Sequence, residues 1–321
     1  MDAVNARPAP YVRPDVQAYL DMTKAAGRPE ICDVPIAEAR YGFRAMQPIT
    51  EVETRSLALI RDLACPGRAG DIPLRLYDAR ANRGPAPAVV FYHGGGFVVG
   101  DLETHHSLCT EIAASLDVPV VSVDYRLAPE HKFPAAPDDC EAAARWIAES
   151  PEALGRDVTA LVPMGDSAGG NLTIVTTQAL MARPAAVPVL LQVPIYPATD
   201  DGPSERGSMV EFGEGFLLNR RTMQWFGDQY AAEARHPRAC PIRADHALTP
   251  PTVLVTAGLD PLRDEGRAYA AELILAGTDV VYLERQGALH GFASTRKIAP
   301  SGQGDLEAIL ATVRLFLERA A

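Results

Sequence analysis

The chain has 321 residues, of which 47% are hydrophobic and 22% charged, a composition typical of globular proteins. Its net charge of −11 argues against partners that need a basic surface, namely nucleic acids and anionic membranes. No stretch approaches the roughly 18 consecutive apolar residues of a membrane-spanning helix. The first residues lack the apolar run of a secretory signal, and the five cysteines include no Cys-x-x-Cys pair. We therefore expect a cytoplasmic protein with reduced thiols.

The chain opens with helical patterns and then changes to alternating strands and helices. Residues 1–50 hold short apolar patterns, interrupted by Gly27 and Pro29, that predict helices preceding the core. The later alternation predicts a largely parallel sheet with helices on both faces. The expected strands are 56–63, 72–77, 88–92, 118–123, 160–164, 189–195, 252–257 and 280–283. The expected helices are 107–116, 138–148, the stretch after Gly170, 264–276 and 305–319.

Two stretches depart from this alternation. Residues 200–238 are rich in Gly, Glu and aromatic residues and read as an insertion over the sheet edge where catalytic loops gather. Pro163 lies inside the fifth expected strand, where its missing N–H is costly. We therefore expect a bulge or a strand end at Pro163.

The fifth strand leads into Gly165-Asp166-Ser167-Ala168-Gly169-Gly170, which contains the pattern Gly-x-Ser-x-Gly. Its glycines leave room for a sharp strand-to-helix turn that lifts the serine hydroxyl above the sheet. Alone, the pattern is better explained as an ordinary glycine-rich turn. A nucleophilic serine also needs a base, an acid that orients the base, and donors for the oxyanion.

Three further motifs supply these groups, each in the segment that follows an expected strand. His93-Gly94-Gly95-Gly96 offers backbone N–H groups that, with the N–H of Ala168, would stabilise an oxyanion. Asp260 is the expected acid because it lies nearest the end of its strand, whereas Asp264 and Glu265 fit as acids favoured by the helix dipole. His290 is the expected base, since no other histidine follows Asp260 in the chain.

Together these motifs resemble the hormone-sensitive-lipase-like esterases, also called bacterial family IV esterases, of the α/β-hydrolase superfamily. The matching stretches are 92–97, 124–136, 165–171, 260–266 and 290–292, and the resemblance extends from about residue 57 to the end. It implies an α/β-hydrolase fold with a mostly parallel eight-stranded sheet, flanking helices and a helical cap. The implied parts are 1–50 as the N-terminal part of the cap, 51–199 as the first part of the core, 200–238 as the cap insertion, and 239–321 as the second part of the core.

The resemblance also implies roles for individual residues. Ser167 would be the nucleophile, His290 the general base and acid, and Asp260 the carboxylate that orients His290. The oxyanion hole would be built from Gly94, Gly95, Gly96 and Ala168, while Asp124 and Arg126 would fix the neighbouring loop. Candidates for contact with the substrate are Phe97, Asp166, Tyr196, Phe212, Phe216 and Leu217. For Phe212, Phe216 and Leu217, packing of the cap onto the core is the simpler explanation.

By the same resemblance, the substrate is a small-molecule ester with a short acyl chain, no metal or cofactor takes part, and a homodimer is the expected assembly. An amidase or formamidase with the same triad is the nearest alternative. A small-molecule receptor of this fold is another, but the receptors that resemble these esterases lack the histidine that His290 provides here. A scaffolding protein would not need three glycines beside a serine turn. His105, His106 and Cys109 fit a helix start better than a metal site, because no fourth ligand is near.

Overall fold

The structure is a computed structural model that describes residues 9–200 and 206–320. Its strands are β1 (Leu59–Gly67), β2 (Gly70–Asp78), β3 (Ala86–Tyr92), β4 (Val120–Val123), β5 (Val158–Asp166), β6 (Val193–Ile195), β7 (Thr252–Leu259) and β8 (Val280–Leu289). They form one eight-stranded sheet in the order β1-β2-β4-β3-β5-β6-β7-β8. Only β2 runs opposite to its neighbours, which confirms the prediction of a mostly parallel sheet.

Ten α-helices occur in the described ranges: α1 (Pro14–Ala26), α2 (Ile36–Ala45), α3 (Gln47–Thr50), α4 (His106–Leu116), α5 (Ala135–Ala148), α6 (Ala168–Ala182), α7 (Gly207–Phe212), α8 (Arg220–Tyr230), α9 (Arg263–Leu275) and α10 (Ser301–Ala320). Short 3-10 helices are η1 (Ile31–Asp33), η2 (Glu152–Leu154), η3 (Pro241–Arg243) and η4 (Phe292–Ser294). No described helix combines the length and apolarity that crossing a membrane requires.

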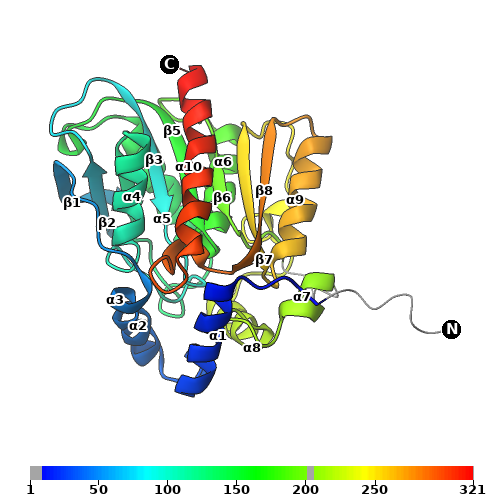
Figure 1. Ribbon diagram of the computed structural model, residues 1–321. Helices are drawn as coiled ribbons and strands as arrows, with labels where there is room; N and C mark the ends of the chain where they lie inside the picture. Colours follow the sequence, from blue (N-terminus) through cyan, green and yellow to red (C-terminus); the bar gives the residue numbers. More distant parts are fainter. Residues whose placement is uncertain (1–8, 201–205, 321) are drawn as a thin grey trace.

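Alternate residues of the buried strands face two separate cores. On β3, Val89 and Phe91 pack on the side of α4 and α10, whereas Val90 and Tyr92 pack on the side of α5 and α6. Both faces are therefore covered, which explains why the sequence of β3 is a continuous apolar run. Figure 1 shows α4 and α10 in front of the sheet.

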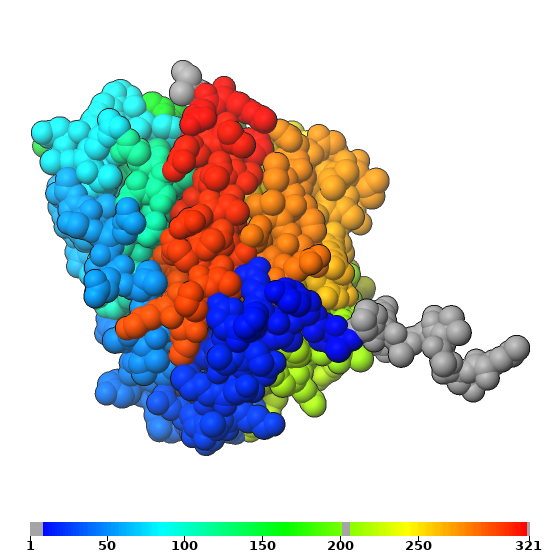
Figure 2. Space-filling model, in the orientation of Figure 1, coloured from blue at the N-terminus to red at the C-terminus, as the bar shows by residue number. Residues whose placement is uncertain are grey.

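The remaining helices gather at one edge of the sheet. In Figure 1, α1, α2, α3, α7 and α8 lie beyond the carboxyl ends of the parallel strands. We call these five helices the covering layer. Its N-terminal part is fixed to the end of the chain, because Arg13 binds the carboxylate of Asp305 at 2.5 Å and Asp15 accepts the N–H of Ser301 at 2.7 Å. Figure 2 shows this contact as blue atoms packed against the orange and red C-terminal segment.

The expectation of a bulge or strand end at Pro163 is wrong. β5 continues to Asp166, and Pro163 pairs with Val90 of β3 in regular register. Leu161, two residues before Pro163, donates its N–H toward the β6 side, to the carbonyl of Pro188. Because N–H groups two residues apart point to the same side of a strand, the missing N–H of Pro163 would also face β6. On that side, β5 pairs with an isolated bridge at Val189 and then with β6 from Val193 onward, and the segment between them is irregular. The irregularity therefore lies in the segment that leads into β6. No regular row of hydrogen bonds runs beside Pro163 there, so its missing N–H deprives no carbonyl of a partner.

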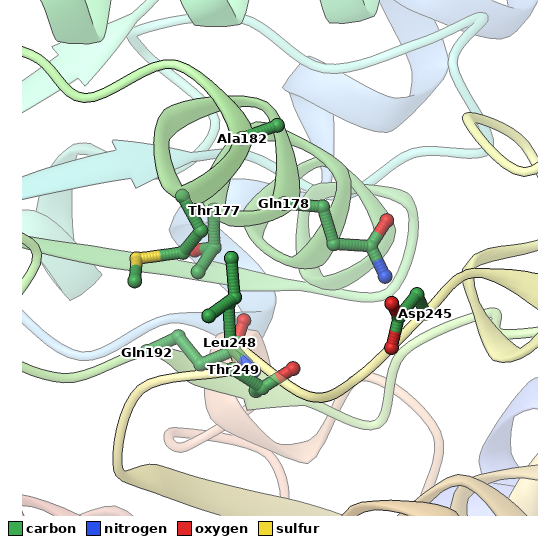
Figure 3. Close-up of a pocket in the computed structure, with 8 residues that line it drawn as sticks. Thr177, Gln178, Ala182, Gln192, Asp245, Leu248 and Thr249 are labelled. Atoms are coloured by element: carbon green, nitrogen blue, oxygen red, sulfur yellow. The ribbon is translucent and has the colours of Figure 1, made fainter.

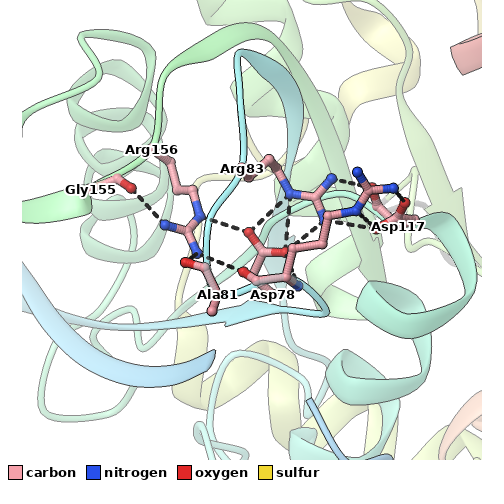
Figure 4. Close-up of polar contacts among 7 residues, drawn as sticks. Asp78, Ala81, Arg83, Asp117, Gly155 and Arg156 are labelled. Carbon is pink, nitrogen blue, oxygen red and sulfur yellow. Dashed lines mark hydrogen bonds and ion pairs between the residues drawn. The ribbon is translucent and has the colours of Figure 1, made fainter. Parts of the chain in front are cut away.

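At the opposite end of the sheet, where the parallel strands begin, a buried charge cluster connects several loops (Figure 4). The fully buried Asp78 carboxylate, at the end of β2, accepts from Arg83 and Arg156, both at 2.7 Å. Arg83 also reaches Asp117 at 2.8 Å, at the end of α4. The cluster ties the loop between β2 and β3 to the chain before β5, at the edge remote from the covering layer.

Candidate active site

Ser167 occupies a strained turn between β5 and α6. Its φ of 56° and ψ of −118° are unusual for a residue with a side chain. The turn depends on the absence of side chains at its flanks, since a Cβ on Gly165 would lie 2.4 Å from the carbonyl oxygen of Tyr92, and one on Gly169 would lie 1.9 Å from it. The serine hydroxyl therefore projects from the carboxyl edge of the sheet, as the Gly-x-Ser-x-Gly pattern predicts.

His290 lies within hydrogen-bond distance of both other residues of the expected triad. His290 Nε2 is 2.8 Å from Ser167 Oγ, and His290 Nδ1 is 2.7 Å from Asp260 Oδ2. Asp260 is fully buried, and its other oxygen accepts the N–H of Leu262 at 2.8 Å. With the Nδ1 proton donated to Asp260, Nε2 presents its lone pair to the serine hydroxyl. This is the arrangement in which a serine can lose its proton to a histidine.

Candidate oxyanion donors lie next to the serine. Within the described residues, no hydrogen bond uses the amide N–H of Gly95, Gly96 or Ala168, so these donors are available to a bound anion. Gly95 and Gly96 have φ values of 120° and 60°, which favour glycine. The N–H of Gly94, in contrast, is already used, because it donates to Asp166 Oδ1 at 2.8 Å.

Asp166 is buried beneath the loop of Gly94–Gly96. Its Oδ1 also lies 3.1 Å from Nε2 of the buried His105, and its Oδ2 lies 3.5 Å from the hydroxyl of Tyr196. Burial alone raises the pKa of Asp166, but the charge of His105 and the Gly94 N–H outweigh burial and leave the pKa below its ordinary value. The structure thus places Asp166 against the loop and away from solvent.

The other candidates for substrate contact fall into two places. The ring of Tyr196 lies 4.8 Å from that of His290, and the ring of Phe97 stacks on Tyr230 at 3.9 Å. Burial and the nearby Asp166 raise the pKa of Tyr196 well above its ordinary value, so its phenol stays neutral. Phe212, Phe216 and Leu217 join a cluster with α1, in which Phe212 is fully buried while Phe216 and Leu217 are partly accessible.

The loop of Gly94–Gly96 is braced by Tyr125, a side chain that the sequence alone did not single out. The hydroxyl of Tyr125 donates to the carbonyl of His93 at 2.7 Å, and its ring stacks on that of His93 at 4.3 Å. Arg126 does not reach this loop, because it binds Asp139 at 2.8 Å instead. The expectation that Arg126 fixes the loop is therefore wrong.

The covering layer also reaches the oxyanion loop. The ring of Phe226, on α8, lies so close to Gly96 that a Cβ there would be 2.3 Å from it. Sequence reasoning missed Phe226 because nothing in a helical pattern says which face meets a loop 130 positions earlier. Gly96 itself was the available signal, because a third consecutive glycine indicates that another part of the protein packs closely against the backbone there.

Two hollows lie outside the triad. One, of about 160 Å³, lies between α6 and the segment before β7 (Figure 3) and includes Thr177, Gln192 and Leu248 in its walls. Gln192 precedes β6, so this hollow lies toward the amino end of the strand, remote from Ser167. The other, of about 830 Å³, is a groove between η1 and α8 with Cys32 and Trp225 in its walls.

Metal ligands are sparse in the described part of the chain. Glu30, Cys32 and Asp33 are the one group of possible ligands there that lie close together, and Arg221 already pairs with Asp33. His105 and His106 point to different partners, since His106 Nδ1 lies 3.1 Å from the hydroxyl of Tyr77. The histidines at the start of α4 thus do not converge on one point.

Comparisons with known proteins identify the fold and the family. Residues 89–294 match the family described as alpha/beta hydrolase fold. An ethyl acetate hydrolase of Pseudomonas putida is 39% identical over 88% of this chain and 92% of its own length. The carboxylic ester hydrolase LipN of Mycobacterium tuberculosis is 41% identical over 81% of this chain and 71% of its own.

Solved structures extend the likeness to the whole fold. A hyperthermophilic esterase from the archaeon Pyrobaculum calidifontis superposes with a TM-score of 0.87 at 38% identity, covering 94% of this chain and 98% of its own. An ester hydrolase from the metagenome of Lake Arreo, complexed with a phosphonate derivative, gives a TM-score of 0.88 at 38% identity, with 95% and 99% coverage. The chain belongs to the hormone-sensitive-lipase-like carboxylesterases of the α/β-hydrolase superfamily.

Proposed function

We propose that this carboxylic ester hydrolase cleaves small esters with short acyl chains through Ser167, His290 and Asp260. The observation that carries the proposal is the pair of contacts made by His290, at 2.8 Å to Ser167 and 2.7 Å to Asp260. The ethyl acetate hydrolase among its relatives supports a short acyl chain.

In the proposed reaction, Ser167 Oγ attacks the ester carbonyl while His290 Nε2 takes its proton. The carbonyl oxygen becomes an oxyanion that accepts hydrogen bonds from N–H groups among Gly95, Gly96 and Ala168. The tetrahedral intermediate then expels the alcohol, which receives the proton from His290, and leaves an acyl group on the serine. A water molecule activated by His290 attacks this acyl-enzyme and releases the acid.

We further propose that the covering layer is the cap over this site, formed by the described parts of 1–50 and 200–238. The proximity of Phe226 to Gly96 supports this role. We also propose a homodimer, which the family resemblance supports, and a cytoplasmic location, which the five free cysteines support.

The test is hydrolysis of p-nitrophenyl esters of increasing acyl length by the wild type and by Ser167→Ala. We expect the wild type to favour acetate to butyrate over octanoate and longer, and the variant to lose activity while keeping its fold by circular dichroism. More than a trace of activity in Ser167→Ala contradicts the assignment of the nucleophile. A formyl amide tested alongside distinguishes an esterase from an amidase.

A further inference from the structure

The loop of Gly94–Gly96 and the turn of Ser167 belong to different strands, and one side chain joins them. Ser167 follows β5, whereas the loop follows the adjacent β3. Asp166 is the residue directly before the serine, and its Oδ1 accepts the N–H of Gly94 at 2.8 Å. The donors Gly95 and Gly96 come next in the chain. The separation between nucleophile and oxyanion donors therefore depends on the Asp166–Gly94 bond.

The fit around this bond is tight. A Cβ on Gly94 would lie 2.5 Å from Asp166 Oδ2, so the loop reaches the carboxylate only because residue 94 is glycine. Asp166 is 4% exposed and His105 is 2% exposed, which excludes water as a routine substitute for either partner. The contact is thus fixed by packing as well as by hydrogen bonding.

His105 holds the carboxylate in this orientation. Its Nε2 lies 3.1 Å from Asp166 Oδ1 and its Nδ1 lies 3.0 Å from Thr104 Oγ1. The hydroxyl of Thr104 donates its own proton to the carbonyl of Asp101, so its oxygen is an acceptor toward His105. Both ring nitrogens of His105 therefore lie beside an oxygen atom, which fixes the orientation of the ring against Asp166. The Gly94 N–H is 3.3 Å from Nε2, so its shorter bond is the one to Asp166.

We propose that Asp166, oriented by His105, is a positioning residue that sets the distance between the Ser167 hydroxyl and the oxyanion donors. The inference rests on the proposed function and gives Asp166 a task other than contact with the substrate. Because only the transition state carries the oxyanion, a displaced loop weakens transition-state binding and leaves ground-state binding largely unchanged.

The test compares Asp166→Ala with Asp166→Asn, His105→Ala and the double alanine variant, using p-nitrophenyl acetate. Asp166→Ala removes the acceptor for Gly94, and we expect kcat to fall about 30-fold with KM within twofold of the wild type. Asp166→Asn keeps an acceptor, so a loss of no more than about fivefold is expected. His105→Ala should lose about tenfold, and the double variant no more than Asp166→Ala, because both act through one bond.

Inhibition by a trifluoromethyl ketone provides a second measurement. A general loss of packing would not change the inhibition constant in proportion to kcat/KM. Its adduct with the serine carries an oxyanion, so its inhibition constant should rise by the same factor as kcat/KM falls in each variant. His106→Ala is the matched control, since His106 begins the same helix but contacts Tyr77, and it should stay within twofold of the wild type.

Three results would overturn the inference: an Asp166→Ala variant with kcat within threefold of the wild type, an Asn variant as impaired as the Ala variant, or a lost kcat with unchanged ketone inhibition. Should Asp166→Ala fail to fold, His105→Ala with normal kcat also overturns it. A wild type without esterase activity would instead refute the proposed function, so the two failures are distinguishable.

Discussion

Asp260 divides its two oxygens between two fixed donors, and this division predicts the effect of removing its charge. Oδ2 faces His290 Nδ1 at 2.7 Å, and Oδ1 accepts the backbone N–H of Leu262 at 2.8 Å. In Asp260→Asn, the Leu262 N–H must still meet an oxygen, so the amide NH₂ turns toward His290. The imidazole then accepts at Nδ1 and carries its proton on Nε2, which is the wrong tautomer for receiving the proton of Ser167.

The expected loss follows from this tautomer. In serine hydrolases with the same arrangement, an asparagine at the position of the acid lowers kcat by about 10⁴-fold. That factor corresponds to about 5.4 kcal/mol of transition-state stabilisation. The shape of the buried side chain is unchanged, so we expect the fold and KM to change little. Residual activity should rise with pH, since hydroxide can replace the missing base.

The assay is kcat and kcat/KM for p-nitrophenyl acetate between pH 6 and pH 10. Asp264→Asn is the matched control, because Asp264 lies one turn further along and accepts the N–H of Ser208 at 2.9 Å rather than contacting His290. We expect Asp264→Asn to keep activity within threefold of the wild type. If Asp260→Asn retains more than a tenth of the activity, or if both variants lose equally, the tautomer argument is refuted.

Three further predictions concern the core, the covering layer and a buried carboxyl. Although burial alone raises the pKa of Asp78, Arg83 outweighs it and holds the pKa below its ordinary value, so Asp78→Asn should lower the free energy of unfolding by about 3 kcal/mol at pH 7. Urea unfolding should show this difference shrinking as the pH falls below about 4, where the carboxyl gains a proton in the unfolded chain before it does so in the folded one; a pH-independent difference would count against the ion cluster. Phe226→Ala removes the ring beside Gly96, and the acyl-length series should shift toward longer esters; an unchanged series would exclude Phe226 from the substrate site. Burial, assisted by the charge of Asp260, raises the pKa of Glu265 to about 8. Its folded pKa therefore exceeds its unfolded one, and the stability of the wild type relative to Glu265→Gln should fall between about pH 5 and pH 8, which unfolding at both pH values measures.

The sequence patterns predicted the sheet well because strands and helices leave local signals. All eight expected strands are present, and the parallel arrangement is confirmed. The errors arise where a residue's role depends on a neighbouring strand. Pro163 lacks an N–H in any structure, but the cost depends on whether β6 offers a regular acceptor beside it, and β6 does not. That lateral information is absent from the residues around Pro163.

The candidate site likewise divides into residues with a local sequence signal and residues whose role depends on their neighbours in space. Ser167, Asp260 and His290 could be selected because each follows a strand and their order in the chain is restrictive. Asp166 was a candidate for substrate contact because it adjoins the serine, but its direction is decided by packing against β3 and α4. His105 appeared as a doubtful metal ligand, since sequence spacing cannot show that its neighbour His106 points elsewhere. Chain order thus identified the reacting groups, and the three-dimensional structure was needed for the groups that hold them.

Strand order also determines how a substrate must lie. The strand β5, which carries Ser167, has β3 on one side and β6, β7 and β8 on the other. The oxyanion loop follows β3, whereas Asp260 and His290 follow β7 and β8. A carbonyl bound over Ser167 must therefore direct its oxygen toward β3, and its leaving alcohol must lie toward His290 to receive the proton. Because Asp166 connects β5 to the loop after β3, its bond to Gly94 acts on the oxyanion side. Its replacement should consequently impair acylation and deacylation alike, as both pass through an oxyanion at the same position.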